Sequence, residues 1–137
     1  MSALLDVYEA DTWSKWTDVV KEHQPALLVT LPHNVESTPF NKLRISAAED
    51  LALNRIGPVH VESPNSDAGS LVLMLGCNPA SPHVGYQGFV NEIRSNGASL
   101  VIATLTNVPA NLPTKLACEF LRQIPAADGQ LTVGEFM

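Results

Sequence analysis

Three short apolar segments, separated by helical patterns, constrain the fold of this chain more than any other feature. They span residues 26–31, 71–75 and 99–106. Apolar, partly β-branched runs of this length are typical of strands buried on both faces of a parallel sheet. Alternation of such strands with helices predicts an α/β fold with a largely parallel sheet.

Three segments have apolar residues at helical spacing: residues 12–23, 86–97 and 111–124. Gln24-Pro25 is expected to end the first helix, and Gly97 to cap the second. The expected inward residues are Trp13, Trp16, Val19 and Val20 in the first helix, Tyr86, Phe89, Val90 and Ile93 in the second, and Leu112, Leu116, Phe120 and Leu121 in the third. Cys118 is expected to pack close to the third set.

The middle of the chain gives weaker patterns. Residues 32–41 are polar and are expected to form a loop, whereas residues 42–46 and 58–63 alternate polar and apolar side chains, as edge strands do. Residues 47–56, between them, predict a short helix. We interpret residues 1–137 as a single domain, and the last residues, "QLTVGEFM", resemble the start of another element.

Composition excludes several classes of function. The chain has 14 acidic residues against 8 Lys and Arg, for a formal charge of −6, which argues against nucleic acid as the main partner. No apolar run approaches the roughly 20 residues of a membrane span. The two cysteines suit neither a disulfide framework nor a zinc site. We therefore expect a cytoplasmic protein without metal or cofactor.

Two residues with reactive side chains follow buried strands at equivalent places. His33 lies two residues after Leu31, and Cys77 lies two residues after Leu75. If the two strands are parallel neighbours, both residues project from one sheet edge, where ligands bind in open α/β sheets. An imidazole beside a thiol stabilises the nucleophilic thiolate. A lone strand-end cysteine is also a common core residue, so a structural role stays open.

Backbone groups around this pair suit acyl transfer. Gly76 allows the chain to leave the strand sharply and lets a substrate approach closely. The backbone N–H groups of Cys77 and near Asn34 are candidate oxyanion donors. The other histidines are weaker candidates: His23 closes a helix, His60 is expected on a surface strand, and His83 lies in a loop.

The order of these motifs resembles the CHAT domain, a caspase-like peptidase domain related to separase. The resemblance rests on "TWSKW", "LLVTLPHN", "LRIS", "GSLVLMLGCNPA", "GASLVIATLTNV" and "TVGEFM", in that order. It implies a caspase-like α/β/α sandwich with a Cys-His dyad, in which His33 matches the family's histidine and Cys77 its nucleophile. Asn34 stands where caspase relatives often have glycine. The strands that normally begin the family domain are missing, which implies the C-terminal portion of a larger domain.

Two functions follow from the resemblance. The first is a cysteine endopeptidase that cleaves a protein or peptide substrate. The alternative is a non-catalytic scaffold module in a bacterial signalling or defence protein, with helical-repeat domains of the same or another chain as partners. A nucleotide-binding domain is disfavoured, because "LPHNVES" after the first strand is not a glycine-rich phosphate loop.

Overall fold

The computed structural model describes residues 6–35, 39–47, 49–62, 69–76, 85–104, 109 and 111–126. Its centre is a parallel sheet of strands β1 (Leu27–Thr30), β5 (Ser70–Met74) and β6 (Ala98–Ala103). The strand order is β1-β5-β6, and both neighbouring pairs are parallel. The three strands predicted from the apolar runs, and their parallel arrangement, are confirmed.

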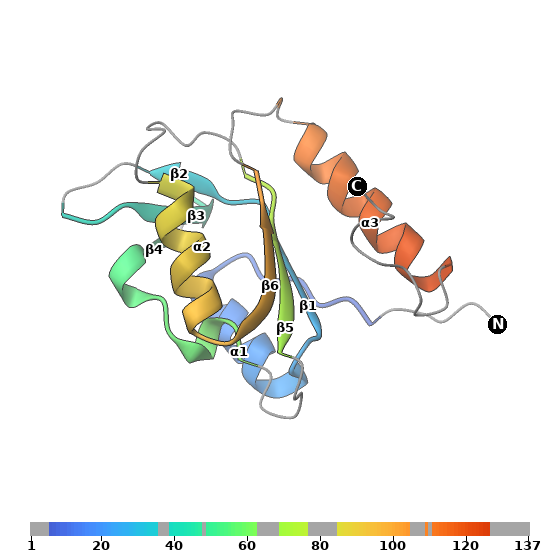
Figure 1. Cartoon of the computed structure of the whole chain (residues 1–137), viewed down its shortest axis with the longest axis horizontal. Coiled ribbons are helices and arrows are strands. Elements are labelled where there is room, and N and C mark those ends of the chain that lie inside the picture. Colours follow the sequence, from blue (N-terminus) through green and yellow to red (C-terminus); the bar gives the residue numbers. More distant parts are fainter. Residues whose placement is uncertain are drawn as a thin grey trace.

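Helices cover both faces of this sheet (Figure 1). Helices α1 (Trp13–His23) and α2 (Gly85–Ser95) pack on one face, and α3 (Leu112–Ala126) packs on the other. The strands supply both cores because their side chains alternate between faces. Val72 and Met74 of β5 belong to the larger cluster with α1 and α2, whereas Leu73 belongs to the α3 cluster.

Helix α1 begins and ends where its sequence predicts. The side-chain oxygen of Thr12 accepts a hydrogen bond from the Lys15 N–H at 3.1 Å, which caps the first turn. Gln24 ends the helix in the left-handed conformation, with φ of 48°. After α2, Gly97 has φ of 121°, a conformation that favours glycine and suits its predicted place at the helix end.

A second, antiparallel sheet lies on the α2 side of the parallel one (Figure 1). It contains β2 (His33–Val35), β3 (Lys42–Ser46) and β4 (Glu49–Ala52), in that order. The predicted strand at 42–46 is therefore confirmed. The loop expected at 32–41 is wrong for residues 33–35, because they pair with β3.

Two further predictions in this region are wrong. Residues 49–52 form a strand instead of a helix, because Leu51 packs in the core opposite Leu43 and this packing overrides helical propensity. Residues 58–60 form a 3₁₀ turn instead of a strand, beginning with Pro58. The short 3₁₀ turn Leu53–Arg55 follows β4.

The inward face of α3 differs from the predicted one. Phe120 is buried as expected, but Leu112 and Leu116 are exposed, and Ala117 is buried in their place. Cys118 is also exposed, so the expectation that it packs in the core is wrong. The helix is turned so that Ala117 and Phe120 face the sheet and form the second core with Leu73 and Leu75.

The described part of the chain is therefore a mixed α/β structure with a three-stranded parallel sheet and three α-helices. None of the described helices combines the length and apolar character needed to cross a membrane.

Candidate functional site

The two candidate catalytic residues follow neighbouring parallel strands at the same register position. Thr30 of β1 lies opposite Met74 of β5, and His33 and Cys77 are each three residues further along the chain. The condition on which the site prediction depends, that these strands are parallel neighbours, is confirmed. Cys77 itself, with the N–H proposed as an oxyanion donor, lies outside the described residues, as does His83.

The chain leading to Cys77 is held by both neighbouring strands. The Leu75 N–H donates to the carbonyl oxygen of Thr30 at 3.0 Å, and the Thr104 N–H donates to that of Met74 at 3.1 Å. The Thr104 hydroxyl then donates to the carbonyl oxygen of Gly76 at 2.9 Å. Gly76 is buried. The residue before Cys77 is thus fixed where the three parallel strands end.

His33 begins β2 and is exposed. It lies opposite Arg44 of β3, while Asn34 lies opposite Leu43. Leu43 is 1% exposed and faces the core, so Arg44, the next residue, faces solvent. Since residues opposite each other on a ladder share a face, His33 lies on the solvent face with Arg44.

Arg44 also lies opposite Asp50 of β4, so His33, Arg44 and Asp50 form a row across the antiparallel sheet. The Arg44 Nε and Nη2 atoms donate to the two Asp50 carboxylate oxygens at 2.7 and 2.9 Å. This hydrogen bonding lowers the pKa of the Asp50 carboxyl and raises the pKa of the guanidinium. The guanidinium of Arg44, the charged group nearest to His33 in this row, is therefore engaged in a bidentate ion pair with Asp50.

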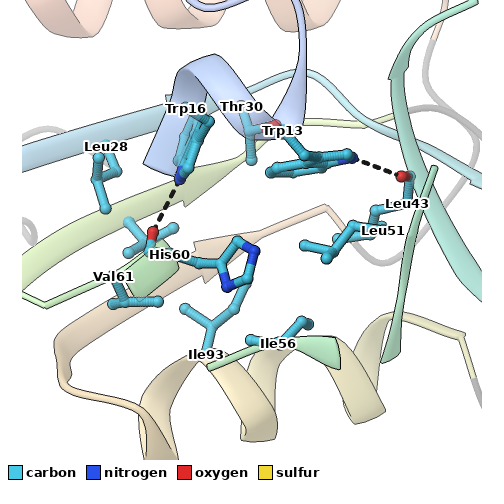
Figure 2. Close-up of a pocket in the computed structure, with 11 residues that line it drawn as sticks. Trp13, Trp16, Leu28, Thr30, Leu43, Leu51, Ile56, His60, Val61 and Ile93 are labelled. Carbon is cyan, nitrogen blue, oxygen red and sulfur yellow. Dashed lines mark hydrogen bonds between the residues drawn. The ribbon is translucent and has the colours of Figure 1, made fainter. Parts of the chain in front are cut away.

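A small internal cavity lies between α1, the two sheets and the 3₁₀ turn of His60 (Figure 2). Its volume is about 20 Å³, which suits one water-sized molecule and excludes a substrate. The Trp13 Nε1 donates to the Leu43 carbonyl oxygen at 2.9 Å, and the Trp16 Nε1 donates to that of His60 at 2.8 Å. Both tryptophans therefore pack and tie elements together, as their helical spacing suggests.

His60 belongs to this interior and not to a surface strand, so that prediction is wrong. Its ring meets the Trp13 ring edge-on, with 6.4 Å between centroids. Burial lowers the pKa of the imidazole, and a bond to the Gly57 backbone opposes this in part. The Nδ1 of His60 lies 3.1 Å from the Gly57 amide nitrogen and 3.3 Å from the Gly57 carbonyl oxygen. It accepts from the Gly57 N–H when it carries no proton and donates to the carbonyl oxygen when it is protonated. The environment favours the neutral ring.

Among the described residues, no three His, Cys, Asp or Glu side chains are grouped so that they could hold a metal ion. His23 stacks on Tyr8, with ring centroids 3.7 Å apart.

Comparisons with protein-family models, with curated proteins and with solved structures found no match. The likeness to the CHAT domain therefore stays a prediction.

Sequence reasoning missed Thr104 and the Arg44–Asp50 pair. Thr104 directly follows β6, so the strand-end argument that identified His33 and Cys77 applies equally to it. The alternation at 42–46 places Arg44 on an exposed face. Its position beside His33 depends on β2, which the polar sequence of that segment does not indicate.

Proposed function

We propose that this protein is a cysteine endopeptidase of caspase-like α/β/α fold, with Cys77 as nucleophile and His33 as its base. The observation that carries the proposal is the register of β1 and β5. It puts Thr30 opposite Met74, so that His33 and Cys77 follow adjacent strands after equal numbers of residues. Parallel strands end at one sheet edge, which is where α/β folds carry their sites.

The chemistry would run in two stages. The Cys77 thiol transfers its proton to the His33 imidazole, and the thiolate attacks the scissile carbonyl carbon. His33 then gives the proton to the leaving amine as the C–N bond breaks, which leaves an acyl-enzyme. Water, deprotonated by His33, attacks the thioester carbonyl and releases the acid, and the thiol is restored. The backbone N–H groups of Cys77 and near Asn34 would stabilise the oxyanion.

The fixed approach to Cys77 supports this assignment. Nucleophilic catalysis needs the attacking atom held close to its productive position. The bond from the Thr104 hydroxyl to the Gly76 carbonyl supplies such a restraint directly before Cys77. The exposure of His33 keeps its ring accessible to solvent and substrate.

The test uses peptidyl acyloxymethyl ketones, which alkylate catalytic cysteines, with arginine, leucine or aspartate next to the reactive group. We expect labelling at Cys77, mapped by mass spectrometry, and its loss in Cys77→Ala. His33→Gln should slow labelling about 100-fold. Cys118→Ala is the matched control, because Cys118 is an exposed thiol. Labelling that persists in Cys77→Ala, or that is as fast at Cys118, would contradict the proposal.

A non-catalytic scaffold is the second candidate, and the position of His33 on a strand favours it. His33 is paired in the antiparallel ladder opposite Arg44, on the solvent face of that sheet. A ladder fixes the direction of a side chain more firmly than a loop does. If the protein is a scaffold, Cys77→Ala should leave the binding of a partner protein unchanged. In the original protein, Cys77 should then react no faster than Cys118.

A further inference from the structure

Strand β1 ends the parallel sheet on one side, and its outer edge is unpaired among the residues that the structure describes. The carbonyl oxygen of Ala26 accepts a hydrogen bond from the N–H of Leu71 in β5 at 2.9 Å, and that of Thr30 accepts one from the N–H of Leu75, directly after β5, at 3.0 Å. Backbone groups of successive strand residues point to opposite edges. The N–H and C=O groups of Leu27 and Val29 therefore point away from β5, toward the open edge.

A large groove runs along this open edge. It has a volume of about 960 Å³ and is lined by residues 6–11, by α1, by all of β1 and by Leu121 of α3. Leu31 is 39% exposed and Val7 is 67% exposed, so apolar surface is accessible on both walls. Unpaired edges with apolar flanks are templates for the addition of another strand.

The outer wall of the groove is held in place by an aromatic contact. The ring of Tyr8 stacks on that of His23, the last residue of α1, with an interplanar angle of 12°. This contact ties residues 6–11 to the end of the helix. Residues 6–11 therefore bound the groove on a second side. An incoming segment does not have to order them on binding, so the entropic cost of binding is lower.

The groove is acidic. Asp6, Glu9 and Asp11 line it, and Lys15 is the one Lys or Arg among its described lining residues. The Lys15 ammonium already lies 3.6 Å from the Asp11 carboxylate. A second copy of the chain, with formal charge −6, would bring the same acidic wall against the first. Charge therefore favours a basic occupant.

We propose that the open edge of β1 binds an extended protein segment in which basic residues alternate with apolar ones, added as a further strand. The backbone groups of Leu27 and Val29 would pair with the segment. Its apolar residues would lie on Leu31 and Leu121, and its basic residues would face Asp6 and Glu9. This interaction involves neither Cys77 nor His33, so it goes beyond the proposed peptidase activity and is independent of it.

The test uses a synthetic nonapeptide of alternating valine and lysine, titrated into the full chain. We expect the backbone amide signals of Leu27 and Val29 to shift in NMR spectra and their hydrogen exchange to slow. A peptide of the same sequence, N-methylated at alternate residues on its pairing edge, should bind about tenfold more weakly because it lacks the backbone donors. A peptide with glutamate in place of lysine should bind more weakly still.

Two variants separate the groove from general charge effects. Glu9→Lys should weaken binding of the lysine peptide about threefold, whereas Glu92→Lys, on an exposed position of α2 outside the groove, should not. Val29→Pro removes an outward N–H without cutting a bond to β5, and should also weaken binding. Equal binding of the glutamate or N-methylated peptide, or shifts confined to other residues, would overturn the proposal. So would a dimer of the free chain that protects Leu27 and Val29.

Discussion

At the scale of single residues, Thr104 is the described side chain that acts most directly on the approach to Cys77. Its hydroxyl donates to the Gly76 carbonyl oxygen. Thr104→Val removes this bond at nearly constant volume, and we expect the free energy of unfolding to fall by about 1 kcal/mol. Urea denaturation measures this change. Thr104→Ser keeps the hydroxyl and is the control; a valine variant as stable as the serine variant would contradict the role given to the bond.

His60 should make stability depend on pH. Burial holds the pKa of its imidazole below the ordinary value of 6.5, so the unfolded chain binds a proton more readily. This contribution to stability is fully present above pH about 6.5 and is lost as the pH falls toward the folded-state pKa. We expect the unfolding midpoint in urea to drop between about pH 7 and pH 5.

His60→Asn tests that assignment. The Asn side-chain oxygen can accept the Gly57 N–H bond but does not titrate. The variant should be less stable at pH 7, because it is smaller, and its stability should change less between pH 7 and pH 5. A slope equal to that of the original protein would assign the pH dependence to other groups.

Single residues also show what the sequence predicts poorly. His60 alternates with valines on both sides, which suggested a surface strand, but Pro58 begins a 3₁₀ turn that carries its ring inward beside Trp13. Cys118 lies on a helix with apolar residues on several sides, so its exposure depends on how the helix is turned. Both outcomes are set by contacts with distant elements.

At the scale of elements, the orientation of α3 decides which of its apolar residues contribute to the stability of the fold. Phe120 is 5% exposed in the cluster with Leu73 and Leu75, whereas Leu116 is 37% exposed. Phe120→Ala should destabilise the protein by about 3 kcal/mol, and Leu116→Ala by less than about 1 kcal/mol. Thermal and urea unfolding measure both variants. Equal losses would mean that α3 presents the leucine face predicted from helical spacing.

The elements that the sequence predicted well have strong periodic signals. The apolar runs at β1, β5 and β6 and the spacing of Trp13, Val20, Phe89 and Ile93 define the central sheet and two of its helices. The antiparallel sheet was predicted only in part, because its strands are short and polar. Residues 49–52 have helical propensity, yet Leu51 is buried against Leu43 and Asp50 pairs with Arg44 across the ladder.

At the scale of the whole molecule, parallel pairing brings the C-terminal ends of β1, β5 and β6 to one edge of a sheet that has a core on each face (Figure 1). The sequence predicted this arrangement, and with it the edge at which His33 and Cys77 follow their strands. It did not predict that His33 starts a strand, nor that Thr104 holds Gly76. The first feature depends on pairing with β3, which the polar sequence of residues 32–41 does not indicate. The second depends on a hydrogen bond between residues 28 positions apart, which local patterns do not encode.

The central claim is that His33 activates Cys77, and the rate of alkylation by iodoacetamide tests it most directly. Peptide mass spectrometry follows Cys77 and the exposed Cys118 separately in one sample. We predict that at pH 7 Cys77 reacts about tenfold faster than Cys118, because a neighbouring imidazole stabilises the thiolate. His33→Gln should abolish that excess. A Cys77 that reacts no faster than Cys118, or equally fast with and without His33, would contradict the account.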